Sequence, residues 1–143
     1  MLVREVMNKE VITVEGTVTV QEAAKMMSEH NVGCLIVVKN KELMGIVTER
    51  DFLSKVIVEG RNPRKTPVQR IMTKEVVLGK PDLDVQEAVD IMHEKGIKKL
   101  PIVKGNKLVG ILTVSDVCSV EPKFIEKLSA LFLFPRRKKN VAG

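Results

Sequence analysis

One internal repeat constrains the fold of this chain more than any other feature of its sequence. Shifting the 143-residue sequence by 65 residues aligns residues 6–52 with residues 71–117 without a gap. The heptapeptides GIVTERD (45–51) and GILTVSD (110–116) then occupy the same position in the two copies. Self-similarity at a fixed interval indicates that each copy is one supersecondary unit that cannot bury its apolar face alone. With two copies, the sequence predicts a duplicated pair and not a solenoid.

Apolar periodicity predicts the same order of elements in each copy, namely strand, helix, strand, strand, helix. An i, i+3, i+4, i+7 stripe starts at Val20 and again at Val85, which is typical of an amphipathic helix. The candidate capping residues are Thr17 or Thr19 and Asp82 or Asp84 before the helices, and Asn31 and Gly96 after them. Paired apolar runs joined by polar turns predict two β-hairpins, 34–38 with 43–47 and 100–103 with 108–112. The predicted fold class is therefore α/β (α+β).

The repeat also suggests how the chain is divided. Residues 1–60 hold the first copy, residues 61–67 form a linker with two prolines, and residues 68–120 hold the second copy. The segment 121–143 has no copy. Its apolar residues predict an amphipathic helix that ends at Pro135 and packs on the core or on a second subunit, followed by a basic tail.

The net charge of +6 is concentrated at the end of the chain. Arg136, Arg137, Lys138 and Lys139 supply four of these charges, so the rest of the chain carries only +2. The four Phe are the only aromatic residues, which argues against the stacking surfaces of single-strand binding proteins. The tail could still contact nucleic acid or an anionic membrane, and this alternative stays open.

Other sequence features predict a cytoplasmic protein without a catalytic site. Cys34 and Cys118 form no C-x-x-C pair, which favours a reduced protein with no disulfide. We expect no membrane span, because the chain contains no apolar run long enough to cross a bilayer. We also expect no secretion signal, because the N-terminal segment MLVREVMNKE has no long apolar stretch. His30 and His93 each stand alone, so no metal site is expected, and no nucleophile or P-loop motif is present. We therefore predict no catalytic residue, no enzymatic activity and no required cofactor.

The doubled heptapeptide allows two interpretations. In each copy a Thr at a strand end precedes an Asp by three residues, Thr48 with Asp51 and Thr113 with Asp116. One interpretation is a capping box, in which the Thr oxygen accepts from an unpaired N–H at a helix start. The other is a nucleoside-phosphate site, because a helix start favours phosphate and a carboxylate can accept both hydroxyls of a ribose. The gapless duplication favours the second interpretation.

At this point the sequence resembles a known family. The repeat order, the segments VGCLIVV and IKKLPIV, and the two heptapeptides are similar to the CBS domain (cystathionine β-synthase domain), whose tandem pair is the Bateman module. The resemblance covers residues 1–120. It implies two intertwined β-α-β-β-α repeats with pseudo-two-fold symmetry and two clefts for AMP, ADP, ATP or S-adenosylmethionine.

The resemblance further implies a regulatory sensor that forms a homodimer and signals to an unidentified effector protein. Two alternatives stay open: a regulator that contacts nucleic acid or a membrane through the tail, and an unliganded dimerisation scaffold.

Carried onto this sequence, the resemblance assigns ribose hydroxyls to Asp51 and Asp116, and ribose or phosphate contacts to Thr48 and Thr113. Each Asp is expected to be essential for binding at its own cleft. The two copies are otherwise not equivalent, and the sequence does not decide which cleft binds more tightly.

The phosphate contacts differ between the copies. Arg50 is placed to meet phosphate, whereas its counterpart Ser115 is neutral. At the other position the charge is in the second copy, because Lys99 is basic and its counterpart Cys34 carries no charge. Pro101 matches the strand that is usual in the family. The base is expected against Ile12, Thr13, Gly33 and Cys34 in the first copy, and against Val77, Leu78, Lys98 and Lys99 in the second.

Overall fold

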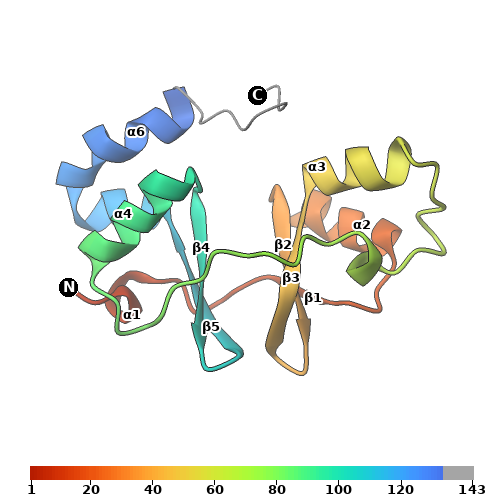
Figure 1. The fold of residues 1–143 in the computed structure, drawn as a ribbon, viewed down its shortest axis with the longest axis horizontal. Helices are drawn as coiled ribbons and strands as arrows, with labels where there is room; N and C mark the ends of the chain where they lie inside the picture. The colour runs from red at the N-terminus through yellow and green to blue at the C-terminus, as the bar shows by residue number, and fades with distance from the viewer. Residues whose placement is uncertain (134–143) are drawn as a thin grey trace. The chain divides into compact units, whose positions relative to one another are not determined.

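The structure is a computed structural model, and it describes residues 1–133. Its elements in chain order are α1 (Val3–Val6), β1 (Thr13–Glu15), α2 (Val20–His30), β2 (Cys34–Lys39), β3 (Glu42–Thr48), α3 (Glu49–Asp51), η1 (Phe52–Ile57), η2 (Val68–Arg70), α4 (Val85–Lys95), β4 (Lys99–Lys104), β5 (Lys107–Thr113), α5 (Val114–Val120), η3 (Pro122–Phe124) and α6 (Ile125–Leu133) (Figure 1). Here η1 is a π-helix, while η2 and η3 are 3₁₀-helices. The predicted mixed α and β class is confirmed. The expected helix stop at Pro135 and the basic residues of the tail lie outside the described residues.

The chain forms two compact units that do not coincide with the two sequence copies. The Asp51 unit comprises residues 12–76, and the Asp116 unit comprises residues 1–11 together with the described residues from 77 to 133. Each unit therefore takes its last or first segment from the neighbouring copy. In the Asp51 unit, Thr73 and Ile46 exchange backbone hydrogen bonds of 2.7 and 2.9 Å. In the Asp116 unit, Asn8 and Ile111 do the same at 2.8 and 2.9 Å. This exchange is the intertwining that the resemblance implies.

Each predicted helix begins after one residue of its candidate N-cap pair and ends at the single residue predicted for its end. Thr19 caps α2, because its Oγ1 accepts the Glu22 N–H at 3.2 Å, and Asp84 caps α4 by accepting the Gln86 N–H at 2.8 Å. At the other end, Asn31 (φ 53°) and Gly96 (φ 66°) adopt the left-handed conformation. The predicted helix ends are confirmed.

The two hairpins have the same pairing and the same irregularity. Cys34 pairs with Thr48 at the open end of β2 and β3, and Lys99 pairs with Thr113 at the open end of β4 and β5. The predicted first strand forms in the Asp51 unit, where β1 runs parallel to β2. In the Asp116 unit it shrinks to one bridge between Gly79 and Ile102. A physical reason is Pro101, which has no N–H to donate to a neighbouring strand.

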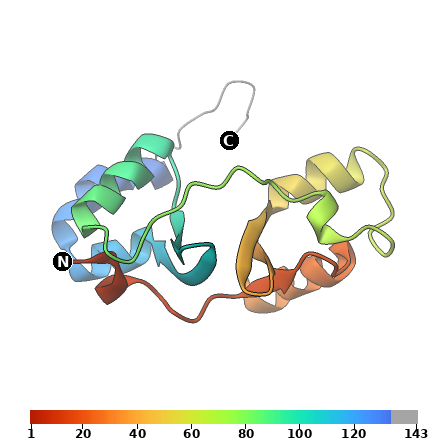
Figure 2. The same ribbon diagram turned by 60° about the horizontal axis from the view of Figure 1, so that its bottom comes forward.

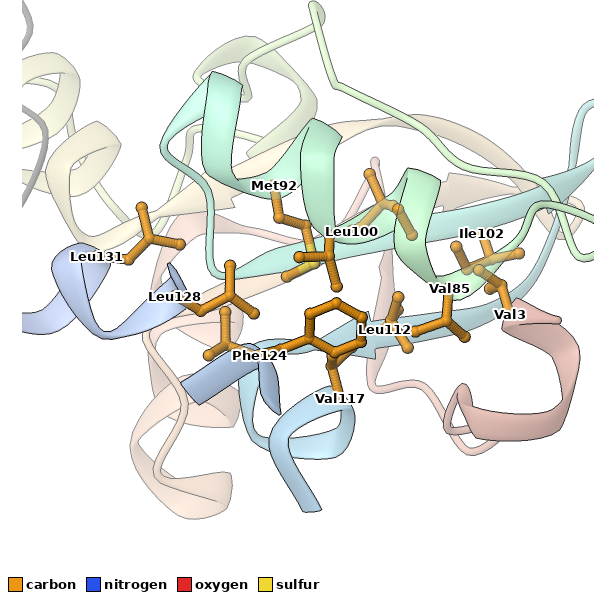
Figure 3. Packing of buried hydrophobic residues seen from close by; sticks show 13 residues of the cluster. Val3, Val85, Met92, Leu100, Ile102, Leu112, Val117, Phe124, Leu128 and Leu131 are labelled. Carbon is orange, nitrogen blue, oxygen red and sulfur yellow. The ribbon is translucent and has the colours of Figure 1, made fainter. Parts of the chain in front are cut away.

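The helix α6 completes the core of the Asp116 unit. Phe124, Leu128 and Leu131 belong to the same buried cluster as Met92 and Leu100, and Figure 3 shows these side chains pointing into it. The helices α4 and α6 lie side by side in Figure 1 and in Figure 2. The structure shows the C-terminal helix on the core, which is one of its two predicted packing sites. Across residues 1–133, no helix has both the length and the apolar character required to cross a bilayer.

The Asp51 unit builds its core without such an added helix. Its buried cluster is formed by α2, β1, β2, β3, η1 and the segment that carries η2. The predicted linker contributes to this packing, because Thr66 is buried and its carbonyl accepts the Val20 N–H at 2.8 Å. The Pro63 carbonyl accepts the Gln21 N–H at 3.0 Å, so the linker satisfies two donors of the first turn of α2.

Candidate functional site

Both heptapeptides form the transition from a strand to a helix. Thr48 ends β3 and Thr113 ends β5, and each is the N-cap of the helix that follows. The Asp51 N–H donates to Thr48 Oγ1 at 3.3 Å, and the Asp116 N–H donates to Thr113 Oγ1 at 3.1 Å. In return, the Thr48 N–H donates to Asp51 Oδ2 at 2.9 Å, and the Thr113 N–H donates to Asp116 Oδ2 at 3.2 Å. The capping-box interpretation is thus confirmed at both motifs.

The glycine that opens each heptapeptide has a packing role. A Cβ added to Gly45 would lie 2.6 Å from the Thr73 carbonyl oxygen, and one added to Gly110 would lie 2.6 Å from Met7 Sδ and 3.0 Å from the Asn8 carbonyl oxygen. In each unit the strand therefore needs a glycine where the exchanged segment passes it. Three positions of the motif, Gly, Thr and Asp, consequently have a structural explanation that is independent of any ligand.

In the Asp51 unit the carboxylate is already surrounded by donors from its own unit. Asp51 is only 5% exposed. Lys55 Nζ lies 2.9 Å from its Oδ1, and Thr73 Oγ1 lies 3.2 Å from Oδ1 and 3.3 Å from Oδ2. Thr48 Oγ1 adds a further contact to Oδ2 at 3.2 Å. Both oxygens of the Asp51 carboxylate are thus engaged by protein donors.

Lys55 and Thr73 are the two residues of this site that the sequence reasoning missed. Lys55 also donates to the Ile71 carbonyl at 3.0 Å, so it joins the start of α3 to the exchanged segment. Its spacing of four residues from Asp51 was a usable signal, because such pairs meet on a helix face. Thr73 lies 22 residues from Asp51 and gave no local signal.

In the Asp116 unit the same carboxylate has fewer partners. Asp116 is half-buried, and Thr113 is its only hydrogen-bonding partner among residues 1–133. The counterpart of Lys55 is Val120, which is 45% exposed, and the counterpart of Thr73 is Asn8. The Asn8 side chain is turned to its own segment, where Oδ1 accepts the Glu10 N–H at 2.9 Å. Within the described chain, Asp116 Oδ1 therefore remains free to accept hydrogen bonds.

Several other predicted residues lie beside the two helix starts. Lys99 is the cross-strand neighbour of Thr113 and Cys34 is that of Thr48, so in each pair the side chains emerge on the same face. The Gly33 carbonyl accepts the Glu49 N–H at 3.1 Å, and the Lys98 carbonyl accepts the Val114 N–H at 3.0 Å. The residues just before β2 and β4 are thus held against the starts of α3 and α5.

The remaining predicted residues are spread over neighbouring elements. Arg50 and Ser115 are exposed in the first turns of α3 and α5. Thr13 pairs with Ile36 in the sheet of the Asp51 unit, next to Ile12, and Pro101 is buried in β4. In the Asp116 unit, Val77 packs against the core, whereas Leu78 is 40% exposed. A ligand role for all of these residues stays a prediction.

A pocket of about 380 Å³ lies beside α3 in the Asp51 unit, and none of the predicted ligand residues lines it. Its walls come from α2, the residues after it and the first residues of α3 and η1, namely Ala24, Met27, Ser28, Asn31, Val32, Glu49 and Phe52. Over residues 1–133, the structure contains no cluster of three His, Cys, Asp or Glu side chains arranged to hold a metal ion.

Comparison with known proteins gives a consistent result. The model of the CBS domain family matches the chain twice, at residues 3–58 and 68–123. An uncharacterised protein of Methanopyrus kandleri is 43% identical over 125 residues, which are 86% of this chain and 64% of that protein. The chain therefore spans just under two thirds of that relative. The CBS domain-containing protein YhcV of Bacillus subtilis is 39% identical over 115 residues, covering 80% of this chain and 81% of YhcV.

Among solved structures, a putative signal-transduction protein with CBS domains from Burkholderia ambifaria is similar to this chain, with a TM-score of 0.68 and 35% sequence identity. The match covers 80% of this chain and 85% of that protein. The duplication seen in the sequence is thus a pair of domains of one family.

Proposed function

The chain belongs to the CBS domain family, and from this premise we propose that it is a regulatory module whose Asp116 unit binds an adenosine ligand: AMP, ADP, ATP or S-adenosylmethionine. One observation carries the proposal. Among residues 1–133, the half-buried Asp116 carboxylate has one oxygen without a hydrogen-bonding partner, directly beside the Thr113 hydroxyl.

The chemistry of this site suits a ribose that carries phosphate. A ribose diol offers two O–H donors, and an ionised carboxylate accepts at both of its oxygens. Such charge-assisted hydrogen bonds are about twice as strong as neutral ones. The Thr113 oxygen already accepts the Asp116 N–H, so its own O–H can donate to a ligand oxygen. Lys99, across the hairpin from Thr113, supplies a cation for the phosphate group.

The Asp51 unit is the weaker candidate in this proposal. A diol could reach the Asp51 carboxylate only by displacing Lys55 and Thr73, both of which already bind it. Displacement would also leave a buried charge without its partner, which opposes binding. We propose that Asp51 acts mainly as an anchor between α3 and the exchanged segment.

The test is calorimetric titration of the purified chain with AMP, ADP, ATP and S-adenosylmethionine. At least one ligand is expected to bind, and Asp116→Asn is expected to weaken it about 10- to 100-fold, because hydrogen bonds to a charged group contribute about 1.5–3 kcal/mol. The amide can still accept the Thr113 N–H, so the fold is retained. Glu94→Gln, on the exposed face of α4, removes one negative charge elsewhere in the same unit and is expected to leave affinity unchanged.

Two results would contradict this proposal. If none of the four ligands binds, the unliganded scaffold becomes the better account of the chain. If the affinity survives Asp116→Asn but is lost in Asp51→Asn, the ligand binds in the other unit. Homodimerisation, an effector protein and contact with nucleic acid through residues 136–139 stay predictions. Sedimentation of the same protein tests the first of them.

A further inference from the structure

A second pocket lies in the Asp116 unit at the closed end of the β4–β5 hairpin. It has a volume of about 380 Å³ and is lined by Arg4, Lys80, Pro81, Asp82, Val103, Lys104 and Gly105. Lys104 pairs with Lys107 at this end of the hairpin, whereas Lys99 pairs with Thr113 at the open end. Five residues of extended strand separate Lys99 from Lys104, a distance of about 17 Å. The pocket is therefore distinct from the Thr113 and Asp116 site.

The charges around this pocket are unbalanced. Arg4, Lys80 and Lys104 bring three positive charges, and Asp82 brings one negative charge. None of these four side chains forms a salt bridge with another residue in the described part of the chain. Gathering cations around one concave surface raises the local concentration of anions. The excess of two positive charges matches the dianion of a phosphate monoester.

Backbone hydrogen bonds hold the three cationic segments together. The Arg4 N–H donates to the Pro81 carbonyl at 3.0 Å, which joins α1 to the segment before α4. The Val103 N–H donates to the Gly79 carbonyl at 3.0 Å, which joins that segment to β4. The fixed φ of Pro81 further restricts the segment. The pocket is thus assembled before any ligand arrives, which reduces the entropic cost of binding.

The corresponding place in the Asp51 unit has the same backbone but different side chains. There the Gln69 N–H donates to the Gly16 carbonyl at 3.0 Å, as Arg4 does to Pro81. Gln69 replaces Arg4, and Glu15 replaces Lys80. Among the counterparts of the pocket-lining residues, the only cation is therefore Lys39, which corresponds to Lys104. The charge excess is therefore absent.

Side chains also lie close against this backbone in the Asp51 unit. A Cβ added to Gly16 would lie 2.7 Å from Gln69 Oε1 and 3.3 Å from Met44 Sδ. The basic pocket is consequently a property of one copy and does not follow from the repeated fold itself. The backbone is the same in both copies, and only the side chains that line the pocket differ. Because these side chains differ in charge, the difference suggests that the pocket has a chemical role in one copy.

We propose that this pocket binds a small organic phosphate monoester. The phosphate contacts Arg4, Lys80 and Lys104, and the Arg4 guanidinium suits its oxygens because it can donate two parallel hydrogen bonds. The apolar part of the ligand packs against Pro81 and Val103. The volume is at the small end of the range of ligand pockets, which favours a ligand of metabolite size.

The test is a titration with phenyl phosphate, followed by the backbone amide signals of the whole chain in NMR spectra. Saturable shifts are expected at Lys80, Asp82, Lys104 and Gly105. Lys80→Gln and Lys104→Gln are each expected to weaken binding about 3- to 10-fold, a modest effect because exposed charges are screened by water and salt. Lys39→Gln is the matched control, since it removes one positive charge from the corresponding position of the other copy and is expected to leave affinity unchanged.

Three results would overturn the proposal. The first is the absence of shifts at the pocket, and the second is an equal loss of affinity in Lys39→Gln, which would show an effect of net charge alone. The third is equally tight binding of inorganic phosphate, which would remove the role of the apolar wall. Because AMP is itself a phosphate monoester, its titration is followed at the amide signals of Thr113 and Asp116, which report the nucleotide site separately from this pocket. Pocket variants are expected to retain AMP binding, and Asp116→Asn is expected to retain phenyl phosphate binding, so either proposal can fail alone.

Discussion

The two Thr–Asp helix starts share a heptapeptide pattern and a capping box, but they treat the aspartate differently. Asp51 is 5% exposed, and donors from its own unit engage both of its carboxylate oxygens. Asp116 is half-buried and is held by Thr113 alone within residues 1–133. The same motif thus anchors structure in one unit and, among the described residues, leaves one carboxylate oxygen without a partner in the other.

The difference arises outside the motif. Lys55 and Thr73 bind Asp51. Their counterparts are the apolar Val120 and Asn8, whose side chain accepts the Glu10 N–H of its own segment. Two positions, neither of them inside the heptapeptide, therefore decide whether the carboxylate is available. In this duplicated fold, the shared motif indicates the structural role that both copies have, which is to cap a helix. The contacts around the motif indicate whether the carboxylate of one copy is also available to a ligand.

The largest expected effect concerns the glycines of the motif. Gly45→Ala is expected to destabilise the chain by about 3 kcal/mol, because the new Cβ would meet a backbone carbonyl that cannot move without shifting the exchanged segment. Gly110→Ala is expected to cost about 1 kcal/mol, because the new Cβ would first meet the flexible Met7 side chain and would lie 3.0 Å from the Asn8 carbonyl oxygen, farther than the 2.6 Å at Gly45. Urea unfolding monitored by circular dichroism measures both. Equal losses in the two variants would show that the exchanged segments are held equally tightly.

The next effect concerns the aspartates themselves. Asp51→Ala is expected to cost about 2–3 kcal/mol, since it takes the carboxylate away from the Lys55 cation and the Thr73 hydroxyl, and the Ile71 carbonyl does not replace its charge. This value is below that of a fully buried pair because the Lys55 side chain is 37% exposed. Asp116→Ala removes only a capping interaction and is expected to cost about 0.5–1 kcal/mol. The same urea titrations distinguish the two, and a larger loss for Asp116→Ala would reverse the comparison.

Much of the fold could be predicted because its signals are local or periodic. The repeat, the helix stripes and the left-handed ends at Asn31 and Gly96 follow from spacing and from residues with known conformational preferences. The reduction of one strand to a bridge could not be predicted with the same ease. Its cause, Pro101, is visible in the sequence, but its partner segment is defined only by the fold.

The candidate site shows the limit of sequence reasoning more sharply. The heptapeptides located both carboxylates, yet their different availability depends on Thr73, which lies 22 residues from Asp51. The basic pocket depends likewise on Arg4 meeting a segment some 76 residues later in the chain, near Lys80. Contacts across such separations are set by the exchange of segments between copies, and no local pattern encodes them.

A transplant of the Asp51 environment would sharpen the comparison. The double variant Asn8→Thr with Val120→Lys places the Thr73 and Lys55 side chains at the corresponding positions around Asp116. We expect the double variant to bind the adenosine ligand about 3- to 10-fold more weakly than wild type does. In the variant the Asp116 carboxylate binds the introduced lysine, which a ribose diol must displace. Calorimetry measures the affinity, and Val120→Met, which adds no charge, is the control. An unchanged affinity would mean that the carboxylate is not the group that binds the ligand.

The smallest expected effect concerns the ion pair that α6 adds to the Asp116 unit. Lys127 donates a hydrogen bond to Asp90. This hydrogen bond is the main reason why the pKa of the Asp90 carboxyl lies below its ordinary value of 3.8. A lowered pKa stabilises the fold at pH values above the ordinary one, and this contribution is lost as the pH falls through the lowered pKa. We expect Lys127→Met to be slightly less stable than wild type at neutral pH in urea, with the difference disappearing in acid. Lys25→Met is the control, at the position in α2 that corresponds to Asp90. It also removes one positive charge, but Lys25 forms no salt bridge with another residue of 1–133. The stability change in Lys25→Met should therefore not depend on pH as it does in Lys127→Met. If both variants responded to pH alike, general charge repulsion would explain the effect, and α6 would be held to the Asp116 unit by its apolar contacts alone.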